Sequence, residues 1–277
     1  MQTHGARNPR YVRFAALGDS TTVGIGDPVA GGWRGWARIL AQSLAGSYDV
    51  SFCNLAAAGA TAQTVLQTQL ADAVAHRPDL ASLIVGVNDV LKSTWDAGRV
   101  RDELVTCADA LTGQGAVLLS VRFHDHSALW PLPGWVRRAF ARRLDELNTV
   151  WDEVVETYGG LRVDLAIRPE IRDRRSWSVD RMHPSELGHR CLARAFAAEL
   201  RASGLAFEPP GAEADGGIPP SWRRDVAWMV AEGAPWLGRR ARDLGPWAVR
   251  VALGEGRADG RTAGRADRPA PAVGAAR

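Results

Sequence analysis

Stretches typical of buried strands alternate with stretches typical of helices over most of the chain. The strand-like stretches are rich in β-branched, aromatic and small apolar residues. One of them, LASLIVGV at 80–87, is apolar almost throughout, as expected of a central parallel strand buried on both faces. About five alternations predict an α/β fold, a doubly wound parallel sheet with helices on both faces. We expect strands at 11–17, 48–55, 80–87, 116–121 and 161–167, and helices at 33–44, 61–75, 100–111, 136–158 and 186–202.

The composition is that of a globular protein and argues against several classes. Lys and Arg total 34 against 31 Asp and Glu, and a net charge of +3 argues against a dedicated nucleic-acid binder. Cys53, Cys107 and Cys191 lie far apart without a C-x-x-C pair, so no disulfide framework is indicated. No apolar leader precedes the first strand, and no run approaches the roughly 18 apolar residues of a membrane span. We therefore expect a cytoplasmic protein.

The first expected strand ends at Gly18-Asp19-Ser20. This position puts Ser20 at the carboxyl edge of the sheet, where open α/β folds carry their chemistry. A serine there is a candidate nucleophile if a histidine reaches it, whereas Asp-Ser after a strand is also a common helix N-cap. The glycine-rich loop that follows, 21–32, matches neither a dinucleotide fingerprint nor a Walker A loop, and we expect no cofactor.

Two more groups follow the second and third expected strands. Gly59 ends a run of small residues at 56–59, which lets backbone approach another group closely or allows tight helix–sheet packing. Asn88 and Asp89 follow the third strand and are, on their own, ordinary turn residues. The backbone N–H groups of Ser20 and Gly59 and the side-chain amide of Asn88 can together supply the donors of an oxyanion hole.

His183 is the best candidate among the six histidines for the base that Ser20 needs. It lies in a turn at the head of the expected helix 186–202, and Asp180 precedes it by three residues. That spacing can bring the carboxylate to the second imidazole nitrogen, where it fixes the tautomer and stabilises the imidazolium. A serine, a histidine and an aspartate are thus available at one edge of the expected sheet.

These residues resemble the four motif blocks of the SGNH (GDSL) hydrolases, in the family's order. The matching stretches are Gly18-Asp19-Ser20, Gly59, Gly86-Val87-Asn88-Asp89 and Asp180-x-x-His183-Pro184. The resemblance covers roughly residues 10–203 and implies a three-layer α/β/α sandwich of the flavodoxin-like kind. It also implies that Ser20 is the nucleophile, His183 the base and Asp180 its orienting carboxylate. By the same resemblance, Ser20, Gly59 and Asn88 form the oxyanion hole.

The surroundings of these blocks suggest a substrate pocket. Its expected members are Asp19, Trp33, Asp89, His124 and Trp130. His124 and His126 alternate around Asp125, which is compatible with metal binding, but a zinc site needs three or four ligands and no further cluster is visible. We therefore expect a substrate-pocket loop rather than a metal site. The family's usual leucine after Gly-Asp-Ser is Thr21 here, which should alter packing rather than chemistry.

The composition changes after residue 204. Residues 1–204 are expected to form the hydrolase domain, 205–220 a linker, 221–254 a short Trp- and Arg-rich helical extension, and 255–277 a disordered tail. Tryptophan and arginine on short amphipathic helices are compatible with peripheral contact to a membrane surface. Packing of these helices across the hydrolase body is the favoured interpretation. Similar tails accompany actinobacterial members of the family.

The residues favour a serine esterase that acts on a small-molecule ester or acylated substrate through an acyl-enzyme on Ser20. An acyltransferase differs only in the acceptor, and a deacetylase of sugars or natural products, a lysophospholipase or a thioesterase is equally compatible with these residues. The alternative from another class is a binding protein that kept the fold and lost catalysis. Neither the acyl group nor the alcohol follows from the sequence.

Overall fold

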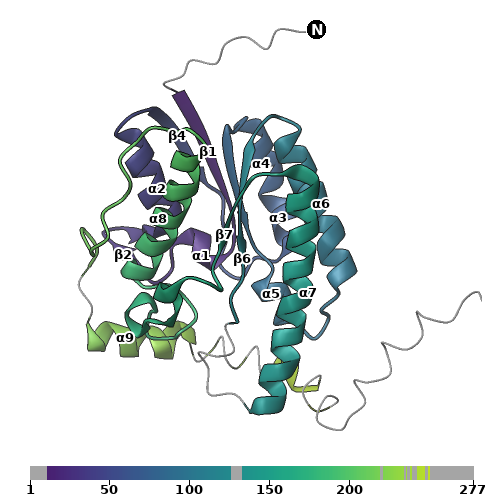
Figure 1. Cartoon of the computed structure of the whole chain (residues 1–277). Helices are drawn as coiled ribbons and strands as arrows, with labels where there is room; N and C mark the ends of the chain where they lie inside the picture. The colour runs from purple at the N-terminus through teal and green to yellow at the C-terminus, as the bar shows by residue number, and fades with distance from the viewer. Residues whose placement is uncertain are drawn as a thin grey trace, which may run out of the picture.

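The computed structural model describes residues 11–125, 133–218 and 221–233, together with 235, 238, 242–246 and 249. Its centre is a five-stranded parallel sheet with the strand order β4-β1-β5-β6-β7 (Figure 1). The strands are β1 (Tyr11–Gly18), β4 (Asp49–Asn54), β5 (Leu80–Ile84), β6 (Val117–Arg122) and β7 (Leu161–Asp164). The first strand lies between the second and third of this set, which is the flavodoxin-like order.

Helices cover both faces of the sheet, as the sequence predicts (Figure 1). One face carries α2 (Gly35–Ala45) and α8 (Glu186–Ala202). The other carries α3 (Ala62–Thr68), α4 (Leu70–Ala75), α6 (Ala97–Thr112) and α7 (Gly134–Tyr158). The prediction of a three-layer α/β/α sandwich is therefore confirmed.

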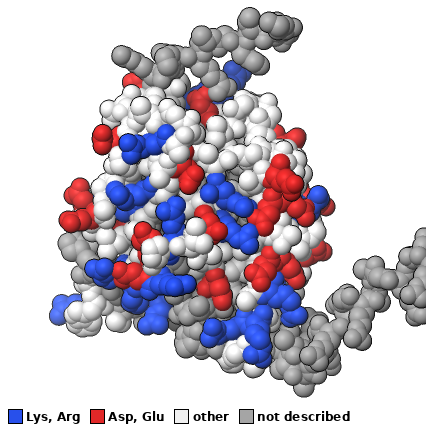
Figure 2. All heavy atoms as spheres, viewed as in Figure 1, with Lys and Arg blue, Asp and Glu red and all other residues white. Residues whose placement is uncertain are grey.

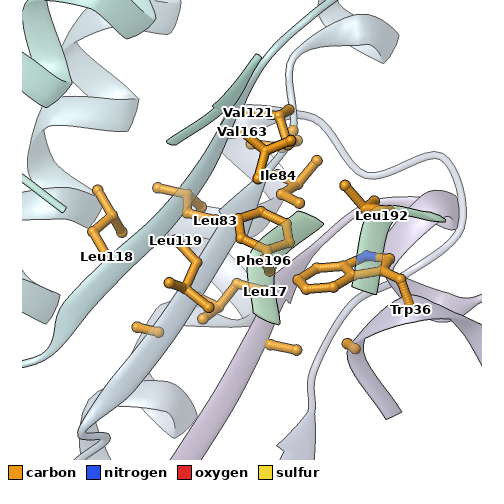
Figure 3. Close-up of a cluster of buried hydrophobic side chains, with 14 of the residues drawn as sticks. Leu17, Trp36, Leu83, Ile84, Leu118, Leu119, Val121, Val163, Leu192 and Phe196 are labelled. Carbon is orange, nitrogen blue, oxygen red and sulfur yellow. The ribbon is translucent and has the colours of Figure 1, made fainter. Parts of the chain in front are cut away.

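The layer between the sheet and α2–α8 is a dense apolar core (Figure 3). Trp36 of α2 and Phe196 of α8 are fully buried, and their rings stack with centroids 4.8 Å apart. Phe14 of β1 is also fully buried and faces Trp36, with ring centroids 6.4 Å apart. This packing fixes α8, and the turn before it, relative to the end of β1.

The structure differs from the predicted elements at several places. The expected helix at 61–75 is divided into α3 and α4 at Gln69, whose side chain bonds to β1. The expected third strand ends earlier, at Ile84, because Val87–Val90 forms the short helix α5. A hairpin of two two-residue strands, β2 (Pro28–Val29) and β3 (Gly32–Trp33), was not predicted.

Two short 3₁₀ helices precede α8, and a docked segment follows it. The turns η2 (Pro169–Arg172) and η3 (Arg174–Ser176) follow β7, which ends at Asp164 rather than at 167. Residues 205–218, expected as a linker, contain no helix or strand but lie against the body, where Phe207 joins the core.

The predicted helical extension begins with α9 (Trp222–Trp228) and the π-helical turn η4 (Met229–Gly233). Residues 255–277, expected as a disordered tail, lie outside the described residues. Within the described part of the chain, no helix is both long and apolar enough to cross a membrane.

Candidate active site

Ser20 begins the short helix α1 (Ser20–Val23), directly after β1. The cap of this helix is Asp19, whose Oδ1 accepts a hydrogen bond from the Thr21 backbone N–H at 3.0 Å. Because Asp19 caps the helix, the Ser20 hydroxyl can serve another partner. Gly18 has φ 146°, and a Cβ at this position would lie only 2.3 Å from the Ile84 carbonyl oxygen, so the close approach of β1 and β5 requires glycine.

Gln69 holds the end of β1 from the side. Its Oε1 accepts from the Gly18 backbone N–H at 2.9 Å, and its Nε2 donates to the Gly18 carbonyl at 3.0 Å. The Gln69 side chain is almost completely buried, so these hydrogen bonds are shielded from water. Gln69 thereby fixes both backbone polar groups of the residue two positions before Ser20.

Ser20, His183 and Asp180 form a continuous chain of hydrogen bonds. The His183 Nε2 and the Ser20 Oγ are 2.8 Å apart, and the His183 Nδ1 and the Asp180 Oδ2 are 2.6 Å apart. A carboxylate only accepts, so Nδ1 carries the proton and Nε2 is left to accept from the Ser20 hydroxyl. This tautomer is the one that a general base for Ser20 requires.

Asp180 is held as a carboxylate by the turn that carries His183. Its Oδ1 accepts from the Ser178 hydroxyl at 2.8 Å and from the backbone N–H groups of Met182 and His183 at 2.9 and 3.0 Å. Burial acts to raise the pKa of Asp180, but the hydrogen bond and charge of His183 and these backbone donors outweigh it, so the pKa is lowered. The tight turn passes through Arg181, which has φ 55°.

Asn88 ties the three loops of the site together. It lies in α5 at the end of β5, and its Nδ2 donates to the Ala60 carbonyl at 3.1 Å and, more weakly, to the Asp19 Oδ2 at 3.5 Å. Gly59 is in the exposed turn just before Ala60, with φ 77°. The turn that carries Gly59 is therefore joined through Asn88 to the loop that carries Ser20.

Two buried carboxyl groups flank this arrangement. Burial raises the pKa of Asp19 to about 6, against the opposing hydrogen bonds from Thr21 and the charge of His183. Burial likewise raises the pKa of Asp89 to about 6. The Oδ2 of Asp89 accepts from the Ala62 backbone N–H at 3.1 Å, so this carboxyl group links α5 to the start of α3.

A largely apolar cavity opens beside Ser20 and His183 and runs between the carboxyl ends of β5, β6 and β7 and helix α8. Asn88 lines it together with Ser20 and His183, whereas Gly59 does not. Its apolar lining includes Ile84, Val121, Phe123, Leu165, Trp177, Leu192 and Ala195. The cavity therefore offers space for an apolar group next to the Ser20 hydroxyl.

The model of the GDSL-like lipase/acylhydrolase family matches residues 16–191, which is more than half of the 277-residue chain. The chain belongs to this family. The matched segment begins inside β1 and ends within α8, so it spans every residue of the Ser20–His183–Asp180 chain.

Individual relatives of this family member are distant. An acetylxylan esterase of Geobacillus stearothermophilus is 23% identical over 171 residues, which cover 58% of this chain and 77% of that protein. The crystal structure of TesA superposes with a TM-score of 0.56 at 20% identity, covering 69% of this chain and 98% of that one. A lipase/acylhydrolase from Enterococcus faecalis gives 0.53 at 17% identity, with 72% and 99% covered. These structural likenesses show the fold.

The predicted pocket residues of this GDSL-like chain fall into three places. Asp19 and His124 line the cavity, and the His124 ring lies 5.2 Å from that of Trp177. Asp89 is not part of the cavity lining because its carboxyl group faces α3. Trp33 lines a separate groove on the other side of the His183 turn. Trp130 lies outside the described residues.

The metal interpretation receives no support from the described part of this acylhydrolase, where no three His, Cys, Asp or Glu side chains come together as ligands. His126, the second histidine of that motif, lies outside the described residues.

Sequence reasoning overlooked Gln69 and Trp228, two residues that contact the site's own elements. The rings of Trp228 and His183 are nearly perpendicular, with centroids 6.1 Å apart. The helical spacing could have indicated Gln69, because this polar residue stands four positions after Val65 and four before Ala73. Both of these apolar residues are fully buried, so Gln69 lies on the buried side of the helix pattern.

Proposed function

We propose that the chain is a serine esterase that cleaves a carboxylic ester through an acyl-enzyme. The Ser20 Oγ attacks the ester carbonyl carbon while its proton passes to the His183 Nε2. The tetrahedral intermediate collapses as the C–O bond to the alcohol breaks, and His183 returns the proton to the leaving oxygen. Water, deprotonated by His183, then attacks the acyl carbon, and Ser20 leaves with its proton restored.

The single observation that carries the proposal is the hydrogen-bond chain from Ser20 through His183 to Asp180. Asp180 holds the Nδ1 proton and stabilises the imidazolium that forms when Nε2 takes the serine proton. The lowered pKa of Asp180 keeps this carboxyl group ionised throughout the neutral range.

The developing oxyanion is assigned to three donors: the backbone N–H groups of Ser20 and Gly59 and the Asn88 side-chain amide. Supporting this role, Asn88 already points one N–H toward the loops that carry the other two donors. The acyl group is assigned to the apolar cavity, since that cavity is lined by Ser20, Asn88 and His183 at one end and by apolar side chains beyond them.

A fluorophosphonate probe tests the nucleophile directly, because it phosphonylates only an activated serine. We expect the wild-type protein to be labelled and the Ser20→Ala variant not to be. Ser47→Ala, at an exposed serine between α2 and β4, serves as the matched control and should label like wild type. A wild-type protein that does not label, or a Ser20→Ala variant that labels equally, would favour a binding protein that has lost catalysis.

The Asn88→Ala variant tests the oxyanion hole. Removing one donor to the oxyanion is expected to lower kcat by on the order of 10²–10³-fold with little change in KM, since the interaction strengthens only as charge develops. Hydrolysis of p-nitrophenyl acetate measures both constants. An unchanged kcat would remove Asn88 from this role.

A carbohydrate deacetylase is a second candidate on one specific observation. The groove beyond the His183 turn is lined by Trp33, Trp177 and Trp228, whose flat rings suit the faces of sugars. The similarity to an acetylxylan esterase points in the same direction. A panel of acetylated xylo-oligosaccharides, lysophospholipids and p-nitrophenyl esters separates this activity from hydrolysis of simple esters.

A further inference from the structure

The large apolar side chains that the described residues expose are distributed unevenly over the molecule. Tyr11 and Val117 begin strands β1 and β6, so they lie at the amino edge of the sheet. All the others lie on segments that follow the carboxyl ends of the strands or in the C-terminal part of the chain. They are Trp135, Ile167, Val179, Ile218, Trp222, Val226, Val230 and Val249. Exposed apolar surface is thus concentrated at the end of the molecule that carries Ser20.

Apart from Ile167, the largest exposures are on the C-terminal extension. Trp222 is 72% exposed, Val226 54% and Val230 68%, and their spacing of four residues puts them on one side of α9 and η4. Trp228, on the same helix, is instead directed at the body, where its ring packs at nearly a right angle to that of His183. The extension is therefore attached to the body through one side and presents an apolar ridge, Trp222–Val226–Val230, to solvent.

Exposed arginines accompany this ridge. The Arg223 guanidinium lies over the Trp222 ring, 5.5 Å from its centroid. At the start of α7, Arg137, Arg138 and Arg142 are exposed beside the exposed Trp135. Figure 2 shows basic side chains along the lower part of the molecule, where Figure 1 places α9 and the first turns of α7. The sequence from 221 to 250 contains arginine at 223, 224, 239, 240, 242 and 250 and acidic residues only at 225, 232 and 243.

We propose that this end of the molecule docks on an anionic lipid surface, with the Trp222–Val226–Val230 ridge in the headgroup layer. Tryptophan favours the boundary between hydrocarbon and water, and arginines beside an apolar ridge attract anionic headgroups. Two segments that are far apart in sequence, the start of α7 and α9, contribute the same pair of residue types to the same end. Docking would turn the carboxyl edge of the sheet, and with it Ser20, toward the lipid.

A second copy of the chain is a poorer occupant of this surface. An isologous contact would place two copies of the same basic surface face to face, and like charges across an interface disfavour association. An anionic bilayer meets both the apolar ridge and the positive charge. The proposal concerns binding alone and does not depend on the ester chemistry.

Co-sedimentation with vesicles tests the proposal on the full chain. Vesicles of phosphatidylcholine mixed with phosphatidylglycerol are compared with vesicles of phosphatidylcholine alone. We expect the wild-type protein to sediment with the mixed vesicles, to bind the neutral ones more weakly, and to be released by added salt. Protein that stays in the supernatant, or binds both vesicles equally, would overturn the proposal.

Two sets of variants identify the surface. Trp222→Ser, Val226→Ser and Val230→Ser together should weaken binding by at least about tenfold, because the apolar area that enters the lipid is lost. Tyr11→Ser and Val117→Ser together, exposed apolar residues at the opposite end, form the matched control and should bind like wild type. Circular dichroism of both variants checks that each is folded.

A second pair of variants tests the contribution of the arginines to binding. Replacing Arg137 and Arg138 by serine should weaken binding to the mixed vesicles by about fivefold per arginine. The same change at Arg77 and Arg201, exposed at the other end of the molecule, should have little effect. Equal binding by the ridge variant and wild type would refute the proposed surface. So would a wild-type dimer in gel filtration that the ridge variant converts to monomer, since the ridge would then be an interface between copies.

Discussion

At the scale of single residues, the site depends on backbone positions as much as on the reactive side chains. Ser20 is placed by Gly18, whose backbone N–H and C=O are both bound to the buried Gln69 side chain. A glutamine amide matches these two groups because it offers one acceptor and one donor in a fixed geometry. Gln69 is therefore expected to act as a positioning residue for the nucleophile.

Replacing Gln69 by leucine tests this role. The variant leaves the Gly18 N–H buried without its acceptor, so the free energy of unfolding should fall by about 1–3 kcal/mol. We also expect a lower kcat and slower fluorophosphonate labelling, with KM less affected, because Ser20 loses its orientation rather than its pocket. Gln67→Leu, at an exposed glutamine two positions earlier in α3, is the matched control. Loss of stability with an unchanged labelling rate would leave Gln69 with a purely structural role.

Asp89 provides a pH-dependent prediction. Its pKa is raised from 3.8 to about 6 in the folded protein, chiefly by burial. Between these two pH values the folded form binds more protons at Asp89 than the unfolded chain does. The contribution of Asp89 to stability is therefore present at low pH and is lost as the pH rises through about 6. Asp89→Asn removes this titration and can keep an acceptor for the Ala62 N–H.

The stability of Asp89→Asn relative to wild type should therefore increase as the pH is raised from 4 to 7, by on the order of 1–3 kcal/mol. Urea unfolding at several pH values measures the difference between the two curves. Asp49→Asn, at an exposed aspartate, controls for the loss of one carboxyl group from the chain. A difference that stays constant or decreases over this range would contradict the raised pKa.

At the scale of elements, the hydrophobic pattern predicted the central strands and the major helices because each one has a face or a run that must be buried. The break at Gln69 was not predictable from local pattern, since it reflects a contact with Gly18, 51 residues away. The β2–β3 hairpin was not predicted for another reason, because strands of two residues are too short to show a hydrophobic periodicity.

The residues of the site also divide into those that a local sequence pattern indicates and those that only a long-range contact brings in. Ser20, Asp180 and His183 lie in short motifs that can be recognised in the sequence. In the structure, His183 is hydrogen-bonded to Ser20 on one side and to Asp180 on the other. Trp228 is in no motif and meets His183 only because residues 205–218 carry the chain back across the molecule. The course of such a segment is set by scattered long-range hydrogen bonds, which leave no pattern in the sequence.

Helix α8 forms one wall of the cavity, and this gives a prediction about the acyl group. Ala195 of α8 is buried and lines the cavity. Ala195→Phe should fill the space and lower kcat/KM for p-nitrophenyl hexanoate relative to the acetate by about tenfold or more, the value of one or more methylenes in an apolar pocket. Ala198→Phe, on the exposed face of the same helix, is the control. An unchanged hexanoate-to-acetate ratio would place the acyl group elsewhere.

At the scale of the whole molecule, the chain beyond α8 is part of the hydrolase body. The Asp215 carbonyl accepts from the side chains of Arg34 and Arg190 at 2.6 and 2.5 Å, and its N–H donates to the Glu186 Oε1 at 2.6 Å. Arg34 in turn is paired with the buried Asp27 through two hydrogen bonds of 2.9 and 3.0 Å. The segment therefore completes a buried network of charges between the β1–α2 loop and the start of α8.

A chain that ends at Gly204 should consequently be much less stable than the full chain. It loses the burial of Phe207, worth about 2 kcal/mol. It also removes the Asp215 carbonyl, which leaves one N–H group of Arg34 and one of Arg190 without its acceptor, at about 1–3 kcal/mol for each. For a domain of this size these losses correspond to a fall in Tm of roughly 10 °C or more. Thermal unfolding followed by circular dichroism measures it.

A chain that ends at Ser221 is the decisive comparison, because it keeps the docked segment and removes α9 and everything after it. Its Tm should lie close to that of the full chain, since Phe207 and Asp215 remain in place. If 205–218 were only a linker, the two shortened chains would unfold at the same temperature. A clear gap between them would instead assign the stabilisation to the buried network around Arg34 and not to the helical extension.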